Sequence, residues 1–150
     1  MKLTILILTF FSYTSEIISV RDLFISAYKS ELHCDNFGEK LYSINMDSSP
    51  LFKGYLGCYY FIKCKYVNNP ADKLSFFKEG KRLLESAISE DPSSVELRLL
   101  RYSIQKKIPR VLLYYDSLEE DIIFVNENII NITDKSTKDF ILYSLNTIDL

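Results

Sequence analysis

Apolar residues recur along most of this chain at the three- and four-residue spacing that places them on one face of a helix. The clearest case is the stretch 118–132, where successive apolar positions step by four, three, four and three residues. These positions are Leu118, Ile122, Val125, Ile129 and Ile132. A second stripe consists of Val20, Leu23, Phe24, Ala27 and Tyr28. No stretch keeps the two-residue alternation of a half-buried strand, so the pattern predicts an all-α fold.

The stretch 51–66, LFKGYLGCYYFIKCKY, has apolar residues nearly all round the predicted helix. Such a helix is buried on most sides, so we expect it at the centre of the protein. Gly54, Gly57 and Cys58 lie on one face of it. Each interior glycine costs about 1 kcal/mol relative to alanine. A packing gain must offset that cost, so these small residues predict a second helix packed closely against this face.

Helix boundaries are marked by capping residues and prolines. Pro50 and Pro70 suit the first position of a helix, where the missing N–H is tolerated. Glu96 and Glu120 each follow a serine by three residues, as in a capping box. The N-caps predicted in this way are Asn36, Ser49, Asn69, Ser93, Ser117 and Asp134. The segment 110–116 fits either a short helical turn or an extended connector. We therefore expect about seven helices in antiparallel hairpins, forming one domain over residues 20–150.

The first residues, MKLTILILTFFSYTS, resemble a secretory signal, with one cation, a short apolar run and then small polar residues. The apolar run is shorter than the roughly 20 residues that span a membrane. We predict a signal peptide within residues 1–19 and therefore export to the periplasm or outside the cell. Thr14 and Ser19 are alternative cleavage points. An uncleaved anchor and a core-forming first helix remain alternatives to cleavage.

Composition places the chain among ordinary globular proteins, with 47% hydrophobic and 25% charged residues. The net charge of −2 offers no broad basic surface to neutralise phosphates. We therefore expect no nucleic-acid binding, and membrane contact only through the signal segment.

The region 56–92 resembles a tetratricopeptide repeat. Leu56, Gly57 and Tyr60 match the first helix of that motif, and the second helix is matched by Gly80, Leu84, Ala87 and Pro92. About eleven extra residues separate the two halves, and Lys53 stands at the usual tryptophan position. The chain also resembles a group of uncharacterised exported bacterial helical proteins. The tetratricopeptide resemblance implies a scaffold of helical hairpins that binds a protein or peptide in a groove.

Residues suited to catalysis are few. His33 is the only histidine, and its neighbours in the sequence point away from it on a helix. Cys58 and Cys64 are separated by a helical rise of about 9 Å, too far for a disulfide. A disulfide bond from Cys34 to Cys58 or Cys64 remains an alternative. The carboxylates of DSLEED, 116–121, fall at a helix start, where they offset the dipole. We therefore predict no catalytic residues, no metal site and no cofactor.

Arg98, Arg101 and Gln105 form a polar stripe on the predicted helix 95–107. Two arginines at this spacing repel mildly unless an anion lies between them. That anion is either the carboxylate cluster 116–121 of the same chain or a carboxylate of a partner, and a plain solvated face is a third interpretation. These three residues are the candidate binding site.

Together these features predict a non-catalytic protein-binding or scaffolding module of an exported bacterial protein. Two alternatives remain. One is a small carboxylate-dependent enzyme, which a buried Asp or Glu in a pocket would favour. The other is a structural subunit of an envelope complex, which an exposed apolar patch beyond the groove would favour.

Overall fold

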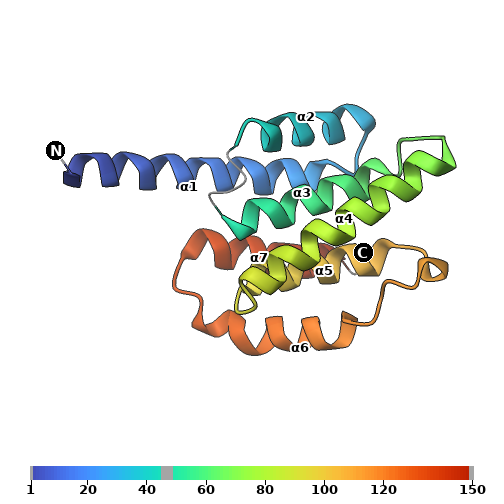
Figure 1. Cartoon of the computed structure of the whole chain (residues 1–150). Coiled ribbons are helices and arrows are strands. Elements are labelled where there is room, and N and C mark those ends of the chain that lie inside the picture. The colour runs from blue at the N-terminus through green and yellow to red at the C-terminus, as the bar shows by residue number, and fades with distance from the viewer. Residues whose placement is uncertain (1, 45–48, 149–150) are drawn as a thin grey trace.

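The computed structural model describes residues 2–44 and 49–148, and every regular element in this part of the chain is helical (Figure 1). The all-α prediction is therefore confirmed. The elements are α1 (Lys2–Ser26), α2 (Glu31–Tyr42), α3 (Pro50–Lys63), α4 (Pro70–Glu90), α5 (Val95–Lys107), η2 (Arg110–Leu112), α6 (Leu118–Asn128), η3 (Ile129–Asn131) and α7 (Lys135–Ile148). The two η elements are single 3₁₀ turns, which are common as connectors.

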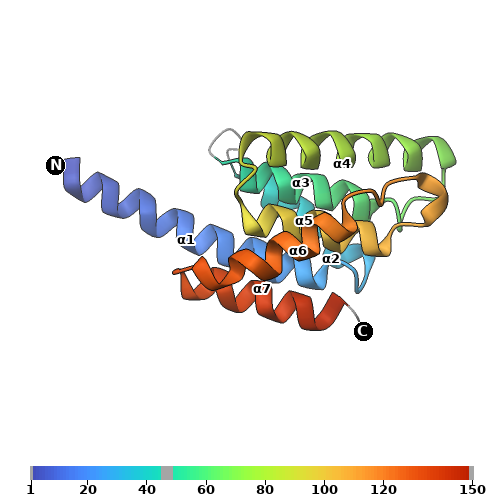
Figure 2. The same cartoon turned by 90° about the horizontal axis from the view of Figure 1, so that it is seen from below.

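Helix α3 lies at the centre of the bundle, as the apolar stretch 51–66 predicted, and α4 packs along its outer side (Figures 1 and 2). The helices cross at two glycines. A Cβ atom on Gly57 would lie 2.9 Å from the carbonyl oxygen of Gly80 and 2.9 Å from the backbone nitrogen of Leu84. On the same face, a Cβ on Gly54 would overlap the Leu97 side chain of α5. The small residues of α3 therefore admit two neighbouring helices, and this prediction is confirmed.

Helix α1 contains 25 residues and runs unbroken through the predicted cleavage region. Its first turns extend beyond the other helices (Figures 1 and 2). Its second half belongs to the bundle, because Ile17, Val20 and Phe24 are buried. Within residues 2–44 and 49–148, no helix has the length and apolar character needed to cross a membrane.

Three of the predicted N-caps are confirmed. The Ser49 side chain accepts a hydrogen bond from the backbone N–H of Leu51, and Asn69 accepts one from that of Ala71. Asp134 accepts the backbone N–H of Thr137 at 2.7 Å and its hydroxyl as well. Hydrogen bonds to Thr137 hold the pKa of the Asp134 carboxyl below its usual value. Each of these caps satisfies an N–H group that has no partner inside its helix.

Two predicted caps are wrong by position. Ser30, not Asn36, caps α2, and its hydroxyl also bonds to His33 Nδ1 at 2.7 Å. Asn36 lies inside α2 because the helix begins five residues earlier. Ser94, not Ser93, caps α5. Glu96 is then only two residues from the cap, so it does not form the predicted capping box.

The chain around α6 also departs from the prediction. Ser117 precedes α6 but its side chain makes no capping bond, so the expected capping box is not formed. The helix ends at Asn128, and the apolar stripe continues through the tighter turn of η3. The ambiguous segment 110–116 begins as the 3₁₀ turn η2.

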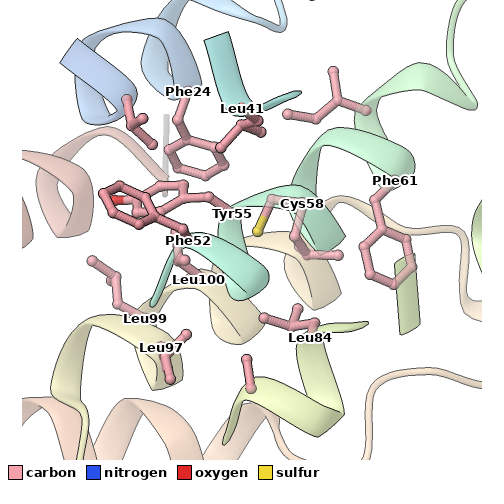
Figure 3. Packing of buried hydrophobic residues seen from close by; sticks show 14 of the residues in the cluster. Phe24, Leu41, Phe52, Tyr55, Cys58, Phe61, Leu84, Leu97, Leu99 and Leu100 are labelled. Carbon is pink, nitrogen blue, oxygen red and sulfur yellow. The ribbon is translucent and has the colours of Figure 1, made fainter. Parts of the chain in front are cut away.

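The hydrophobic core is rich in aromatic rings packed around Tyr55 of α3 (Figure 3). Tyr55 meets Phe24 and Phe37 edge to face, with ring centroids 5.6 and 6.3 Å apart. Cys58, also buried, lies beside these rings and fills space (Figure 3). All three cysteines are free thiols. Burial raises the pKa of the Cys34 thiol to about 11.

Candidate binding pocket

An apolar pocket of about 590 Å³ lies where α3 ends, α4 begins and α5 ends, at the right-hand end of the bundle in Figure 1. Buried Phe61, Ile62 and Ile104 form its floor. Leu74 of α4 and Leu112 of η2 form exposed parts of its edge. A pocket of this size and character is typical of ligand and side-chain recognition sites, which occupy roughly 300–1,000 Å³.

The edge of the pocket is positively charged. Lys65, Lys73 and Lys107 line it and are all exposed. Among residues 2–44 and 49–148, no carboxylate lines the pocket or forms an ion pair with these three lysines. Pro70, the first residue of α4, is also in the wall, so the positive end of that helix dipole faces the same space. The electrostatic environment therefore favours an anionic group beside an apolar one.

The segment that follows the pocket edge is unusually apolar for a surface. Val111 is 82% exposed, and Leu112 and Leu113 are exposed beside it. Leu113 adopts a left-handed backbone with φ of 50°, which costs a residue other than glycine about 1–2 kcal/mol. The exposed side chains and the strained backbone together give the pocket an apolar lip, 111–113.

Tyr114 fixes the far end of this lip. Its ring stacks on Phe61, with centroids 5.5 Å apart, and its hydroxyl donates to Glu85 Oε1 at 2.5 Å. The ammonium group of Lys81 also lies over this ring, 4.9 Å from its centroid. Burial and the Glu85 carboxylate raise the pKa of the Tyr114 phenol. The lip is therefore held in a defined place next to the pocket floor.

Cys64 lines the pocket, and its surroundings disfavour the reactive thiolate. The thiol donates to the carbonyl oxygens of Tyr60 and Lys73, at 3.3 and 3.4 Å. Burial raises its pKa. Since the thiolate is the reactive form, this cysteine is suited to packing rather than to covalent chemistry.

The predicted stripe on α5 lies elsewhere, against α4 and α6. Arg101 donates through Nε and Nη2 to both oxygens of Asp121, at 2.7 and 2.8 Å, and through Nη1 to Glu85 at 2.8 Å. Arg98 donates to Asp121 and Glu120, at 2.9 Å each. The carboxylate cluster of the same chain thus supplies the anion, which confirms the internal ion-pair interpretation.

Gln105, the third residue of the stripe, is buried and takes no part in this ion-pair cluster. Its Oε1 accepts no hydrogen bond from any described residue. None of Arg98, Arg101 and Gln105 lines the lysine-edged pocket. The structure thus brings the two arginines together with Asp121 and separates all three predicted residues from the concave surface.

A second buried ion pair was missed at the sequence level. Arg21 of α1 donates to both oxygens of Glu96, at 2.8 and 2.6 Å, and Tyr55 donates to the same carboxylate at 2.5 Å. Arg21 also donates to Ser136 and Thr137 at the start of α7, at 3.2 and 2.8 Å. The sequence did contain one indication of this pair, because Arg21 is a charged residue next to Val20 in the apolar stripe 20–28. This network connects α1, α3, α5 and α7.

A smaller hollow of about 430 Å³ lies between α1 and α7. Its walls combine Ile18 and Tyr143 with the carboxylates of Asp22 and Asp139. Arg21 also lines this hollow, but its guanidinium group is ion-paired with Glu96. Across the described ranges, no group of three or more His, Cys, Asp or Glu side chains is arranged to hold a metal ion.

Comparisons with known proteins give no relative for this chain. No family model, no curated protein and no solved structure matches it. The residues of the pocket and its surroundings are therefore the basis for any functional argument.

Proposed function

We propose that this chain is a non-catalytic protein-binding or scaffolding module of an exported bacterial protein, and that the lysine-edged pocket is its recognition site. The single observation that carries the proposal is an apolar floor surrounded by three lysines, none of which has a carboxylate partner in the described part of the chain. An apolar side chain of a partner segment would fill the floor, and flanking carboxylates would meet the lysines. Interfaces of this type combine an apolar anchor with a polar rim.

The alternative of a carboxylate-dependent enzyme finds less support among the described residues. Asp121 and Glu96 are buried, but each is bound by an arginine and neither lines the pocket. A catalytic acid of this type needs a carboxyl group that can hold and release a proton near its substrate. His33 is occupied at the start of α2 by Ser30. Among the described residues that line it, the pocket therefore offers binding surfaces and no carboxylate for acid–base chemistry.

The tetratricopeptide-like interpretation and export belong to the same proposal. The close crossing of Gly57 with Gly80 supports a helical hairpin of the kind that the resemblance implies. The composition of residues 1–15 supports export. Sequencing of the N-terminus of the protein recovered from cell-envelope fractions tests export, and an intact Met1 would contradict cleavage.

A random-peptide phage library tests the binding proposal without knowledge of the partner. The wild-type protein and Leu74→Asp are immobilised in parallel, because Leu74 lines the pocket and is 50% exposed. Leu142→Asp is the matched control, because Leu142 is 45% exposed on α7 and does not line the pocket. We expect the wild type and the control to enrich the same peptides and Leu74→Asp to lose them. Equal enrichment by all three proteins would contradict the pocket as the binding site.

A further inference from the structure

Helix α6 presents an acidic and apolar stripe that no other described element covers. Glu119, Ile123 and Glu127 are four residues apart on this helix, so their side chains lie along one face. All three are exposed, and Ile123 is 50% exposed. Neither glutamate forms an ion pair within the described ranges, whereas Glu120, one residue off the stripe, is held by Arg98. This stripe is therefore an aliphatic side chain between two carboxylates that no described cation neutralises.

The chemistry of this α6 stripe is the complement of the lysine-edged pocket. The pocket combines an apolar floor with Lys65, Lys73 and Lys107, which form no ion pair with any described residue, and the stripe combines Ile123 with Glu119 and Glu127. We propose that the partner segment is α6 of a second copy of this chain, with Ile123 inserted in the pocket and its flanking glutamates against the lysines. This inference rests on the proposed binding function and names its partner.

The two surfaces lie on different elements, so one molecule can donate α6 and receive a neighbour's α6 at the same time. The pocket lies among the ends of α3 and α5 and the start of α4, whereas α6 lies along another side of the bundle (Figures 1 and 2). When each molecule binds a different neighbour on either side, the interface is heterologous, since two different patches meet. Heterologous contacts close into rings or propagate as chains, and either outcome suits a scaffold.

Sedimentation velocity across a range of protein concentrations tests the inference. We expect the wild type to associate, and Leu74→Asp and Ile123→Asp each to remain monomeric, because each lacks one of the two surfaces. Both replaced side chains are about half exposed, and circular dichroism verifies that the variants are folded. Leu142→Asp, outside both surfaces, should associate like the wild type. A wild type that stays monomeric at all concentrations would overturn the inference.

Mixing the two defective variants gives a sharper test. Leu74→Asp retains an intact α6 stripe and Ile123→Asp retains an intact pocket, so their mixture should form a one-to-one dimer and nothing larger. If each variant is monomeric but the mixture also fails to associate, α6 does not enter the pocket. An interface between two identical patches would give that result.

Charge reversal separates electrostatic complementarity from simple apolar contact. Each exposed ion pair should strengthen association by about two- to fivefold, less at high salt. Replacing Lys65, Lys73 and Lys107 by Glu should weaken association, and adding Glu119→Lys and Glu127→Lys in the same chain should restore it. No restoration would contradict the charge argument. If the wild type is monomeric but phage peptides still require Leu74, only the second-copy inference fails; if both assays are negative, the proposed function fails as well.

Discussion

The buried pair of Arg101 and Asp121 should be one of the most sensitive points in the fold. The Asp121 side chain is fully buried and that of Arg101 is 8% exposed, and two hydrogen bonds join them. Removing one partner of such a pair leaves an uncompensated charge, which typically costs about 3–5 kcal/mol. Arg98 still reaches Asp121 at 2.9 Å and screens part of that charge. We therefore expect Arg101→Ala to lower the free energy of unfolding by roughly 3 kcal/mol.

Thermal and urea unfolding followed by circular dichroism measure this loss. For a domain of this size, 3 kcal/mol corresponds to a fall in Tm of about 10 °C. Arg82→Ala is the matched control, because Arg82 is 63% exposed and pairs with Glu79 on the surface of α4. Surface pairs of this type contribute little to stability. If Arg101→Ala destabilises the protein no more than Arg82→Ala does, the reasoning from burial is wrong.

The double variant Arg101→Met with Asp121→Leu examines the same reasoning from the opposite side. Replacing both charged groups by apolar side chains of similar volume is often neutral or stabilising. We expect the double variant to recover most of the loss of stability caused by Arg101→Ala.

A binding assay on the variant Arg98→Ala with Arg101→Ala, at a temperature where it is folded, asks whether these arginines take part in recognition. Peptide binding or self-association that survives the two substitutions would show that they do not.

Three further outcomes follow from the structure. Gly57→Ala should lower Tm, because its Cβ would press on the α4 backbone and overpacking costs about 1–3 kcal/mol, more than the helix propensity gained; an unchanged Tm would contradict the close crossing. Relative to a chain starting at residue 13, one starting at residue 20 loses buried Ile17 and the ring contact of Tyr13 with Phe52, and should be less stable by at least about 2 kcal/mol; equal unfolding temperatures for the two chains would refute this. The pKa of Asp134 is lowered in the folded protein, so its capping contribution to stability is complete above the unfolded pKa and is lost as pH falls through the folded pKa. Asp134→Asn should therefore flatten the fall of Tm at acid pH. An unaltered fall of Tm would contradict this.

The helical fold could be predicted because its signals are local. The spacing of apolar residues identified the helices, and Gly57 identified a close crossing whose partner is Gly80. Caps were less certain, since Ser93 and Ser94 are adjacent and both are good caps, and only the backbone conformation decides between them. Glu96 has the right spacing for a capping box, but its buried partner Arg21 is 75 residues away. No local pattern contains that information.

The pocket could not be predicted for a related reason. Lys65, Lys73 and Lys107 come from a connector and two different helices, and nothing in their sequence spacing indicates that they converge. Arg98 and Arg101 were conspicuous because they share one helix face, and that same proximity gives them one common carboxylate. Arg98, Arg101 and Asp121 neutralise one another within the fold, whereas the three lysines at the pocket form no ion pair with any described residue.

The four-helix network at Arg21 has a consequence for how the protein folds during its synthesis. Arg21 is synthesised early, but its partner Glu96 follows 75 residues later, and Ser136 and Thr137 follow 115 and 116 residues later. The ribosome adds about 5–20 residues per second, so for several seconds the first helix carries a cation whose partners do not yet exist. The network that joins α1, α3, α5 and α7 can therefore close only after Thr137 has been synthesised, which makes the docking of Arg21 a late step.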